Sequence, residues 1–284
     1  MAFNYDSLKR ITTAGIVDRT ISTTDLASNS VTNGKLANTT ITAAKFAGSA
    51  VDLASSVTTG TAATGKGGTG LTSVGTANYA LTINSANNAL AFAPVGLGGM
   101  QVFTSSSTWT RPANVRFIKI QLQGGGGAGS GHGESGGAGG YAERILDVTG
   151  IGSVSVTIGG EVGGSYYSGA GGNGNASSFG SYLSAGAGYG ANRNNQHSGG
   201  LAGTGSGGTV NIYGGGGQPH EGRSAVGGDS YWGGSVAAGH PQGGNFSHNH
   251  QSHSAPGSGG AGAYFNGHLG SNGRPGLCVV TMYY

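Results

Sequence analysis

The sequence has little of what most proteins use to fix a fold or to bind a charged partner. A single cysteine, Cys278, among 284 residues excludes a disulfide scaffold and a cysteine-rich metal domain. Charged residues make up only 8% of the chain, and the net charge is +3. This excludes a charge-driven disordered chain and leaves no basic patch for nucleic acid. Six prolines without a Gly-X-Y register exclude collagen.

Long apolar runs are also missing. No run approaches the roughly 18 residues of a membrane-spanning helix, so we expect no membrane insertion. The N-terminal segment MAFNYDSLKR lacks the apolar core of a signal peptide. We therefore expect the protein to be made in the cytoplasm without a signal peptide.

Glycine is the residue present in excess. The chain has 63 glycines, which is about three times ordinary usage. Only 12 of them fall in residues 1–100, whereas 51 fall in residues 101–284. So sharp a change in glycine content near residue 100 indicates two regions with different kinds of structure.

Residues 21–53 carry a ten-residue repeat of the form [Ile/Val]-[Ser/Thr]-x-x-[Asp/Lys]-[Leu/Phe]-Ala-x-x-x. Each copy suits one helical turn followed by extended backbone. An apolar residue every five positions fits neither a helix stripe nor a strand, and one chain cannot bury such residues against itself. We therefore expect three identical chains around a common axis, although a disordered Ser/Thr/Ala linker is the alternative. The expected trimer core is Ile21, Leu26, Val31, Leu36, Ile41, Phe46 and Val51.

Residues 65–94 read as a glycine hinge followed by a β-hairpin. Alternating residues at Tyr79–Ile83 and Leu90–Phe92 flank Asn87-Asn88, which is a strand–turn–strand signal. A lone hairpin is marginally stable, so this one too is expected to need partner chains.

The decad repeat, the GGTGL segment at residues 67–71 and the ALTIN…NNALAFAP hairpin resemble the shafts of tailed-bacteriophage fibres. Downstream, QVFTSSSTWTRPANVRFIKIQLQGGGGAG, GGYAERILDVTGIGSVSVTIGG and NGRPGLCVVTMYY resemble the glycine-rich tip domain of such fibres and of host-binding adhesins. The resemblance implies an elongated homotrimeric fibre that is mostly β. Its segments would be virion attachment at 1–20, a repetitive shaft at 21–64, the hinge and hairpin at 65–100, and the tip domain at 101–284.

This resemblance also implies a location in the tail fibre of the virion, a function and partners. The expected function is attachment of the virion to the host cell by non-enzymatic receptor binding. The N-terminus would dock on other phage tail proteins, and the tip would bind a bacterial surface polysaccharide or outer-membrane protein. The alternative is a structural tail or adaptor protein of the virion without a receptor of its own.

The C-terminal region contains several β-rich runs separated by glycine tracts. The runs predict a compact β scaffold with Trp109 and Phe103 in its core, and they are Phe117–Leu122, Tyr141–Val148, Val154–Ile158, Val210–Tyr213 and Leu277–Tyr284. Residues 124–140 hold 11 glycines in 17 positions, which are costly to order unless backbone groups bond neighbouring tracts. Two arrangements are open: a polyglycine-II lattice of three-residue helices, or looser glycine loops on a jelly-roll-like scaffold.

Three motifs look catalytic but lack the context that catalysis needs. Residues 60–67 begin like a Walker A loop, yet Gly67 stands where Ser or Thr must meet magnesium. Residues 65–70 match the dinucleotide fingerprint without its βαβ unit. Residues 133–137 place Ser135 at nucleophile-elbow spacing, but no helix former follows. No acidic pair is placed for glycoside cleavage, so we expect no enzyme.

All eight histidines follow residue 131, and three of them cluster at residues 248–253. On extended chain His248 and His250 share a face, and three chains would supply six nitrogens for an axial transition metal. A solvated polar loop is the ordinary interpretation and the one we favour, so no cofactor is expected.

Aromatic residues beside glycine or small polar residues give the clearest functional signal. Rings without aliphatic neighbours suit exposed, rigid contact area for sugars or protein loops, although some are expected to be structural. We expect receptor recognition in the loops of residues 163–270. The candidates are Tyr166, Tyr167, Tyr189, Tyr213, Tyr231, Trp232, Phe246, Tyr264 and Phe265.

Overall fold

The chain forms two units in a computed structural model, Met1–Thr72 and Ser73–Tyr284, and each is described by itself. The structure describes residues 22–28, 30–32, 71, 75–83, 86, 88–166, 169–192, 198–219, 225–235, 254–263 and 269–284. Most of the predicted trimer core lies outside the described residues, namely Ile21, Leu36, Ile41, Phe46 and Val51.

In the first unit, the described part of the repeat contains one turn of 3-10 helix, η3 (Thr23–Asp25). The Asp25 carboxylate closes this turn by accepting hydrogen bonds from the Ser22 N–H at 2.8 Å and the Ser22 hydroxyl at 2.7 Å. These bonds, that of the hydroxyl above all, lower the pKa of Asp25. The single helical turn predicted for the repeat is therefore present in this copy. Leu26 and Val31 are 48% and 52% exposed on the single chain.

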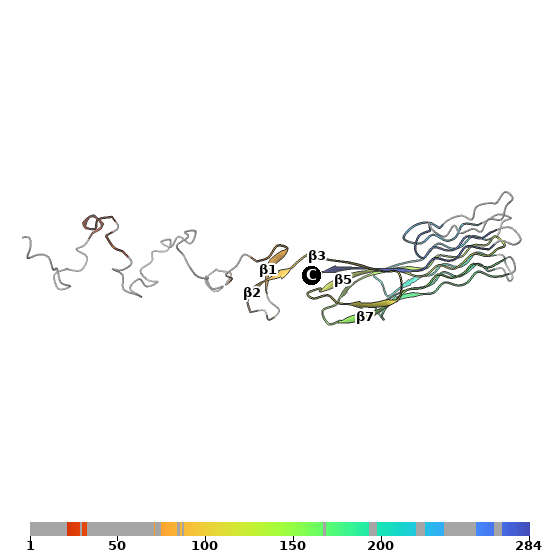
Figure 1. The fold of residues 1–284 in the computed structure, drawn as a ribbon, viewed down its shortest axis with the longest axis horizontal. Helices are drawn as coiled ribbons and strands as arrows, with labels where there is room; N and C mark the ends of the chain where they lie inside the picture. Colours follow the sequence, from red (N-terminus) through yellow and green to blue (C-terminus); the bar gives the residue numbers. More distant parts are fainter. Residues whose placement is uncertain are drawn as a thin grey trace, which may run out of the picture. The chain divides into compact units, whose positions relative to one another are not determined.

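The second unit is built from antiparallel strands, and none of its described residues is in an α-helix (Figure 1). It begins with a hairpin in which β1 (Tyr79–Ile83) pairs with β2 (Leu90–Pro94). Tyr79 lies opposite Pro94, and Ile83 lies opposite Leu90. The predicted strand–turn–strand is confirmed.

A five-stranded sheet follows, with the strand order β11-β6-β5-β12-β3. FIKIQL forms its central strand because Ile118, Ile120 and Leu122 point inward and are fully buried, while Phe117 and Lys119 point outward. Four of these strands were predicted within one residue at each end, and β3 was not predicted. The bounds are β3 (Leu97–Phe103), β5 (Phe117–Gln123), β6 (Tyr141–Asp147), β11 (Val210–Ile212) and β12 (Leu277–Tyr283).

The other five-stranded sheet has the order β10-β9-β8-β7-β4. The SVSVT segment of β7 alternates, so that Val154 and Val156 point inward and the hydroxyl residues between them point outward. Only β7 was predicted from the sequence. The bounds are β4 (Ser107–Thr110), β7 (Ser153–Thr157), β8 (Ser177–Phe179), β9 (Leu183–Ala185) and β10 (Gly205–Ser206).

One hydrophobic core lies between the two sheets and makes them a β-sandwich. Trp109 from β4 is fully buried, and its ring centroid lies 5.9 Å from that of Phe179. Phe103 packs against the same core. The predicted β scaffold with Trp109 and Phe103 in its core is confirmed.

The glycine tracts continue from the sheets as extended chains that run side by side (Figure 1). Tract 124–130 follows β5 directly, and the N–H groups of its first six residues donate in a cycle of three, each at 2.9 Å. The first and fourth donate to tract 134–140, the second and fifth to tract 170–175, and the third and sixth to tract 269–274. Hydrogen bonds whose direction repeats every three residues are expected of an extended helix with three residues per turn.

Carbonyl groups complete the surroundings of this tract. They accept hydrogen bonds from tracts 186–191 and 257–263 and from Ser165, so tract 124–130 is bonded to six neighbouring segments. Tract 134–140 is enclosed in the same way: it donates to tracts 186–189, 214–218 and 257–260, and it accepts from tracts 124–130, 199–203 and 225–228. These two tracts form the centre of a backbone lattice.

Close approach of backbones explains why these tracts need glycine. A Cβ atom on Gly126 would lie 2.1 Å from the carbonyl oxygen of Ser258, and one on Gly139 would lie 2.2 Å from that of Gly124. Both distances are far below van der Waals contact. The buried methyl groups of Ala128 and Ala138 occupy places where the lattice has room.

Candidate functional site

The lattice presents several aromatic side chains to solvent, and three of the predicted candidates are more than half exposed. Tyr166 is 63% exposed, Tyr189 is 53% and Tyr213 is 74%. Tyr189 stands on an extended segment held by its neighbours, because its N–H donates to the carbonyl of Leu201 and its carbonyl accepts the Gly137 N–H, both at 2.9 Å. Exposed rings on a fixed backbone lose little entropy when they bind.

Tyr231 and Trp232 have a different environment from these three. The Tyr231 ring stacks on Tyr141 with centroids 3.7 Å apart, and Trp232 meets Tyr231 edge-on at 5.6 Å. Tyr141 is almost fully buried beneath them, while Tyr231 and Trp232 remain 49% and 37% exposed. These two rings therefore cover a buried tyrosine as well as presenting a face to solvent.

Polar groups anchor Tyr141 on the sheet. Its hydroxyl donates to Glu143 at 2.7 Å and accepts from the Gln121 side-chain amide at 2.9 Å. Burial, assisted by the bond to Glu143, raises the pKa of Tyr141. Although burial tends to raise the pKa of Glu143, hydrogen bonds from Tyr141 and from Lys119, whose Nζ lies 3.1 Å away, hold that pKa below its ordinary value. These polar contacts connect Tyr141 through Glu143 to Lys119 and hold the Tyr141 ring on the sheet.

A groove runs along tract 186–192 between tracts 170–174 and 198–204. It consists of two adjoining hollows of about 370 and 620 Å³, and Tyr189 and Asn173 line both of them. The floor is glycine and alanine backbone, and Leu201, which is 72% exposed, stands on the far wall. The groove therefore has a flat peptide floor with one aromatic ring rising from it.

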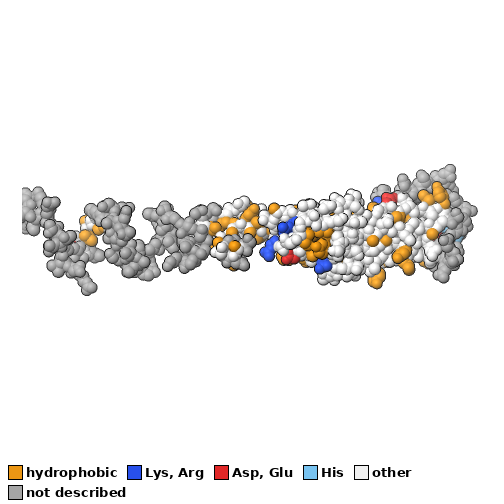
Figure 2. Space-filling model, turned by 90° about the horizontal axis from the view of Figure 1, so that it is seen from below, with side chains coloured by type: hydrophobic (Ala, Val, Ile, Leu, Met, Phe, Trp, Pro, Cys, Tyr) orange, Lys and Arg blue, Asp and Glu red, His pale blue; other side chains and the backbone are white. Residues whose placement is uncertain are grey.

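Every residue lining this groove is uncharged. Its polar side chains are Asn173, Asn192, Ser198 and Thr204, and the Asn173 amide oxygen accepts the Gly190 N–H at 2.9 Å. An aromatic ring beside amide and hydroxyl groups suits a neutral polar ligand, with the ring stacking on an apolar face and the polar groups bonding its hydroxyls. Charged side chains are also sparse on the face of the molecule drawn in Figure 2.

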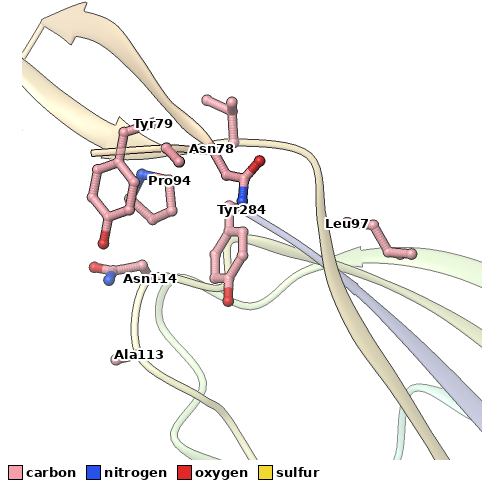
Figure 3. A pocket seen from close by; sticks show the side chains of 9 residues that line it. Asn78, Tyr79, Pro94, Leu97, Ala113, Asn114 and Tyr284 are labelled. Carbon is pink, nitrogen blue, oxygen red and sulfur yellow. The ribbon is translucent and has the colours of Figure 1, made fainter. Parts of the chain in front are cut away.

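A third hollow of about 550 Å³ lies where the hairpin meets the sandwich (Figure 3). Tyr79 and Pro94 come from the hairpin, and Tyr284 and Asn114 come from the end of the sandwich. Asn114 adopts a left-handed backbone with φ 66°, which asparagine tolerates better than most residues. Leu97 points away from the other labelled side chains (Figure 3).

Ser135, the serine with nucleophile-elbow spacing, is buried inside the lattice. Its hydroxyl donates to the Val226 carbonyl at 2.6 Å and accepts the Gln218 N–H at 2.7 Å. These bonds join the central tract to two other segments, so the geometry gives Ser135 a structural role.

The turn between the two central tracts carries a buried acidic group. The carboxylate of Glu134 accepts a hydrogen bond from the Ser130 hydroxyl, and its other oxygen lies 3.3 Å from His132 Nδ1. These contacts of Ser130 and His132 with the Glu134 carboxylate close the turn between the two central tracts.

Some predicted site residues fall outside what the structure describes. They are Tyr167, Phe246, Tyr264 and Phe265 among the aromatics, and His248 and His250 as the metal-ligand pair. Within the described ranges, no group of three or more His, Cys, Asp or Glu is placed to hold a metal ion. Within the same ranges, no helix has both the length and the apolarity to span a bilayer.

Comparison with known proteins identifies the larger part of the chain. Residues 101–283 match the glycine-rich domain family, and because this match covers more than half of the sequence, the chain belongs to that family. The match includes the lattice and both sheets of the sandwich, apart from the start of β3 before residue 101. A search of curated proteins found no significant match.

Sequence reasoning named Tyr189 but did not find the groove beside it. The walls come from tracts about 15 residues away on either side, joined by backbone hydrogen bonds such as Gly174 N–H to the Gly188 carbonyl. Glycine tracts have no side-chain pattern that identifies their neighbours. Asn173 and Leu201, larger side chains in runs of glycine and alanine, were the only signal for these walls.

Proposed function

We propose that the protein is a homotrimeric tail fibre of a bacteriophage whose glycine-rich tip binds a receptor on the bacterial surface without enzymatic activity. One observation carries the proposal: a hydrogen-bonded lattice holds the exposed Tyr189 beside an uncharged groove. A rigid scaffold that presents aromatic contacts is the usual basis of specific, non-catalytic binding. The resemblance of the decad repeat to fibre shafts supports the assignment to a virion.

The groove around Tyr189 favours surface polysaccharide as the receptor class, with an outer-membrane protein loop as the other partner that fits an aromatic anchor. Its uncharged lining makes electrostatic steering a minor contribution to binding. Single contacts of this kind are weak, and three tips on each of several fibres would multiply them by avidity. The N-terminal segment would join the fibre to other tail proteins.

Competition with virions tests the receptor-binding role. Purified protein should block adsorption of the virions to host cells in a dose-dependent manner, because it occupies the same sites. A purely structural tail protein would leave adsorption unchanged, and that result would contradict the proposal. Host mutants that lack surface polysaccharide or single outer-membrane proteins then identify the receptor class.

Two tyrosine variants locate the binding site. Tyr189→Ala should weaken cell binding by roughly thirtyfold, the loss of about 2 kcal/mol typical of a central aromatic anchor. Tyr213→Ala is the matched control, since Tyr213 is more exposed but does not line the groove. If Tyr189→Ala bound cells as well as Tyr213→Ala does, the receptor site would lie elsewhere.

The trimer has its own test in the shaft. Ile41→Asp would place three charges in one axial layer, where unpaired buried charge is strongly unfavourable. Sedimentation should show dissociation or loss of folded protein. An unchanged trimer would show that Ile41 does not face the axis.

A further inference from the structure

The two outer faces of the sandwich have opposite chemistry. On the β4–β7–β8–β9 sheet, every residue that points away from the core carries a hydroxyl group. Register pairs Thr110 with Ser153, Thr108 with Ser155, and Thr157 with Ser178. Ser178 in turn pairs with Ser184. Such a face is fully compatible with water.

The opposite outer face, on the β3–β12–β5–β6 sheet, is largely apolar. Register places Leu97, Tyr283, Phe117 and Asp147 in one row across the sheet. The next row runs from Met100 through Thr281 and Lys119 to Ile145. Six large side chains on this face are between 36% and 65% exposed: Leu97, Met100, Val102, Phe117, Ile145 and Tyr283. Monomeric proteins rarely expose apolar residues gathered in this way.

Charge does not oppose the approach of a second, identical face. Lys119 and Glu143 lie on this face and neutralise each other at 3.1 Å. The Asp147 carboxylate also lies on this face, and hydrogen bonds from Thr149 together with the charges of Arg116 and Arg111 lower its pKa. The Arg116 guanidinium lies 5.9 Å from the centre of the Phe117 ring, at cation–π distance. A copy of the chain would therefore meet a largely apolar surface that matches its own and whose few charges are balanced by opposite charges nearby.

The hairpin that precedes this sheet has the same need for a partner. Tyr79, Leu81 and Ile83 point to one side of β1 and are 43%, 42% and 66% exposed. Only two residues separate β2 from β3, the edge strand that carries Leu97, Met100 and Val102. Exposed apolar residues thus follow one another along the chain from the hairpin onto the sheet.

We infer that the apolar face of the β3–β12–β5–β6 sheet is a self-association surface that packs against the same face of other copies of this chain. Three parallel chains in register would bring three identical faces to the same level around one axis. The hydroxyl face would then remain in water, and the groove beside Tyr189 would stay available to receptor. This inference rests on the homotrimer of the proposed function.

Cysteine cross-linking of the full-length protein tests this surface directly. Met100→Cys and Ile145→Cys place thiols on the apolar face, and Ser155→Cys is the matched control on the hydroxyl face. The native Cys278 is buried and gives little background. A short bifunctional maleimide should join Met100→Cys or Ile145→Cys chains to one another at dilute protein concentration, and it should leave Ser155→Cys chains single.

Each other outcome overturns the inference in a distinguishable way. A trimer by sedimentation in which neither variant on the apolar face cross-links would reject this surface and leave the trimeric fibre intact. A monomer by sedimentation would reject the homotrimer and the surface together. Cross-linking from both faces to the same extent would show random collision. Met100→Asp should in addition lower the thermal midpoint of the trimer more than Thr108→Asp, and equal midpoints would contradict the inference.

Discussion

The sandwich and the glycine lattice hold their structures by opposite means. In the sandwich, side chains such as Trp109, Ile120 and Phe179 fill the space between two sheets, and the strands are joined to their neighbours by backbone hydrogen bonds within each sheet. In the lattice, backbones occupy the interior themselves, and each central tract bonds to six neighbouring segments. The first region depends on apolar area, whereas the second depends on hydrogen bonds and on the absence of side chains.

This difference determines what each region tolerates. A net hydrogen bond contributes about 0.5–1.5 kcal/mol, and fixing a glycine costs more backbone entropy than fixing any other residue. A lattice of glycine is therefore stable only when almost every peptide group is bonded. A side-chain core instead concentrates its stability in a few large residues, each of which matters greatly.

The largest effect is expected in the sandwich. Trp109→Ala should lower the free energy of unfolding by about 3–5 kcal/mol, because it removes the largest fully buried side chain. Trp232→Ala is the control, since Trp232 is 37% exposed and should cost much less. Urea unfolding measures both variants. Equal losses would mean that the core does not depend on Trp109.

A smaller loss is expected from one added methyl group in the lattice. Gly126→Ala places its Cβ 2.1 Å from the Ser258 carbonyl oxygen and should cost about 1–3 kcal/mol by overpacking. Gly160→Ala is the matched control, because a Cβ there would meet no atom within 4 Å. Its effect should stay within about 0.5 kcal/mol. Similar thermal midpoints for the two variants would show that the tracts are not closely packed.

The effect of pH through Glu143 on the sheet should be smaller still. Since the folded-state pKa of Glu143 is below its ordinary 4.5, its contribution is present above that pH and is lost as the pH falls through the folded value. We expect Glu143→Gln to remove about 0.5 kcal/mol of stability at pH 7 and almost none at pH 2. Urea unfolding at the two pH values checks this. A constant difference between wild type and variant would contradict the assignment.

The smallest effect is expected at Cys278. Burial raises the pKa of this thiol to about 12, so it should stay unreactive toward a thiol reagent at pH 8 in the native protein. Its labelling rate then reports opening of the sandwich alone. If the lattice can loosen without opening the sandwich, Gly126→Ala should leave the labelling rate of Cys278 nearly unchanged. Rapid labelling of the native wild-type protein would show that the core is open to solvent.

Sequence patterns predicted the sandwich better than the lattice, for a physical reason. Alternation in FIKIQL and SVSVT follows from a period of two, which strands with one buried face impose on side chains. β8, β9 and β10 were missed because their two or three residues include no β-branched side chain, whereas β11, which is equally short, carries Val210 and Ile212. β3 was missed because Gly98 and Gly99 interrupt its alternation.

From the sequence, the lattice could be predicted only as one of the arrangements that the high glycine content allows. Glycine content indicated that backbones can pack closely, but no side chain marks which tract lies beside which. The six neighbours of tract 124–130 come from segments spread over residues 134–274. The candidate site shares this limit, since Tyr189 was visible in the sequence and the walls of its groove were not.

Amide hydrogen exchange resolved by residue tests the central claim, that backbone hydrogen bonds order the glycine tracts. The amides of Gly124–Gly129 should exchange as slowly as those of β5. In an outer tract protection should follow the period of three, with Gly200 and Gly203, which donate to the Ser135 and Ala138 carbonyls, slower than Leu201 and Ala202 between them. Fast exchange throughout Gly124–Gly129, at the rate of an open chain, would contradict the lattice.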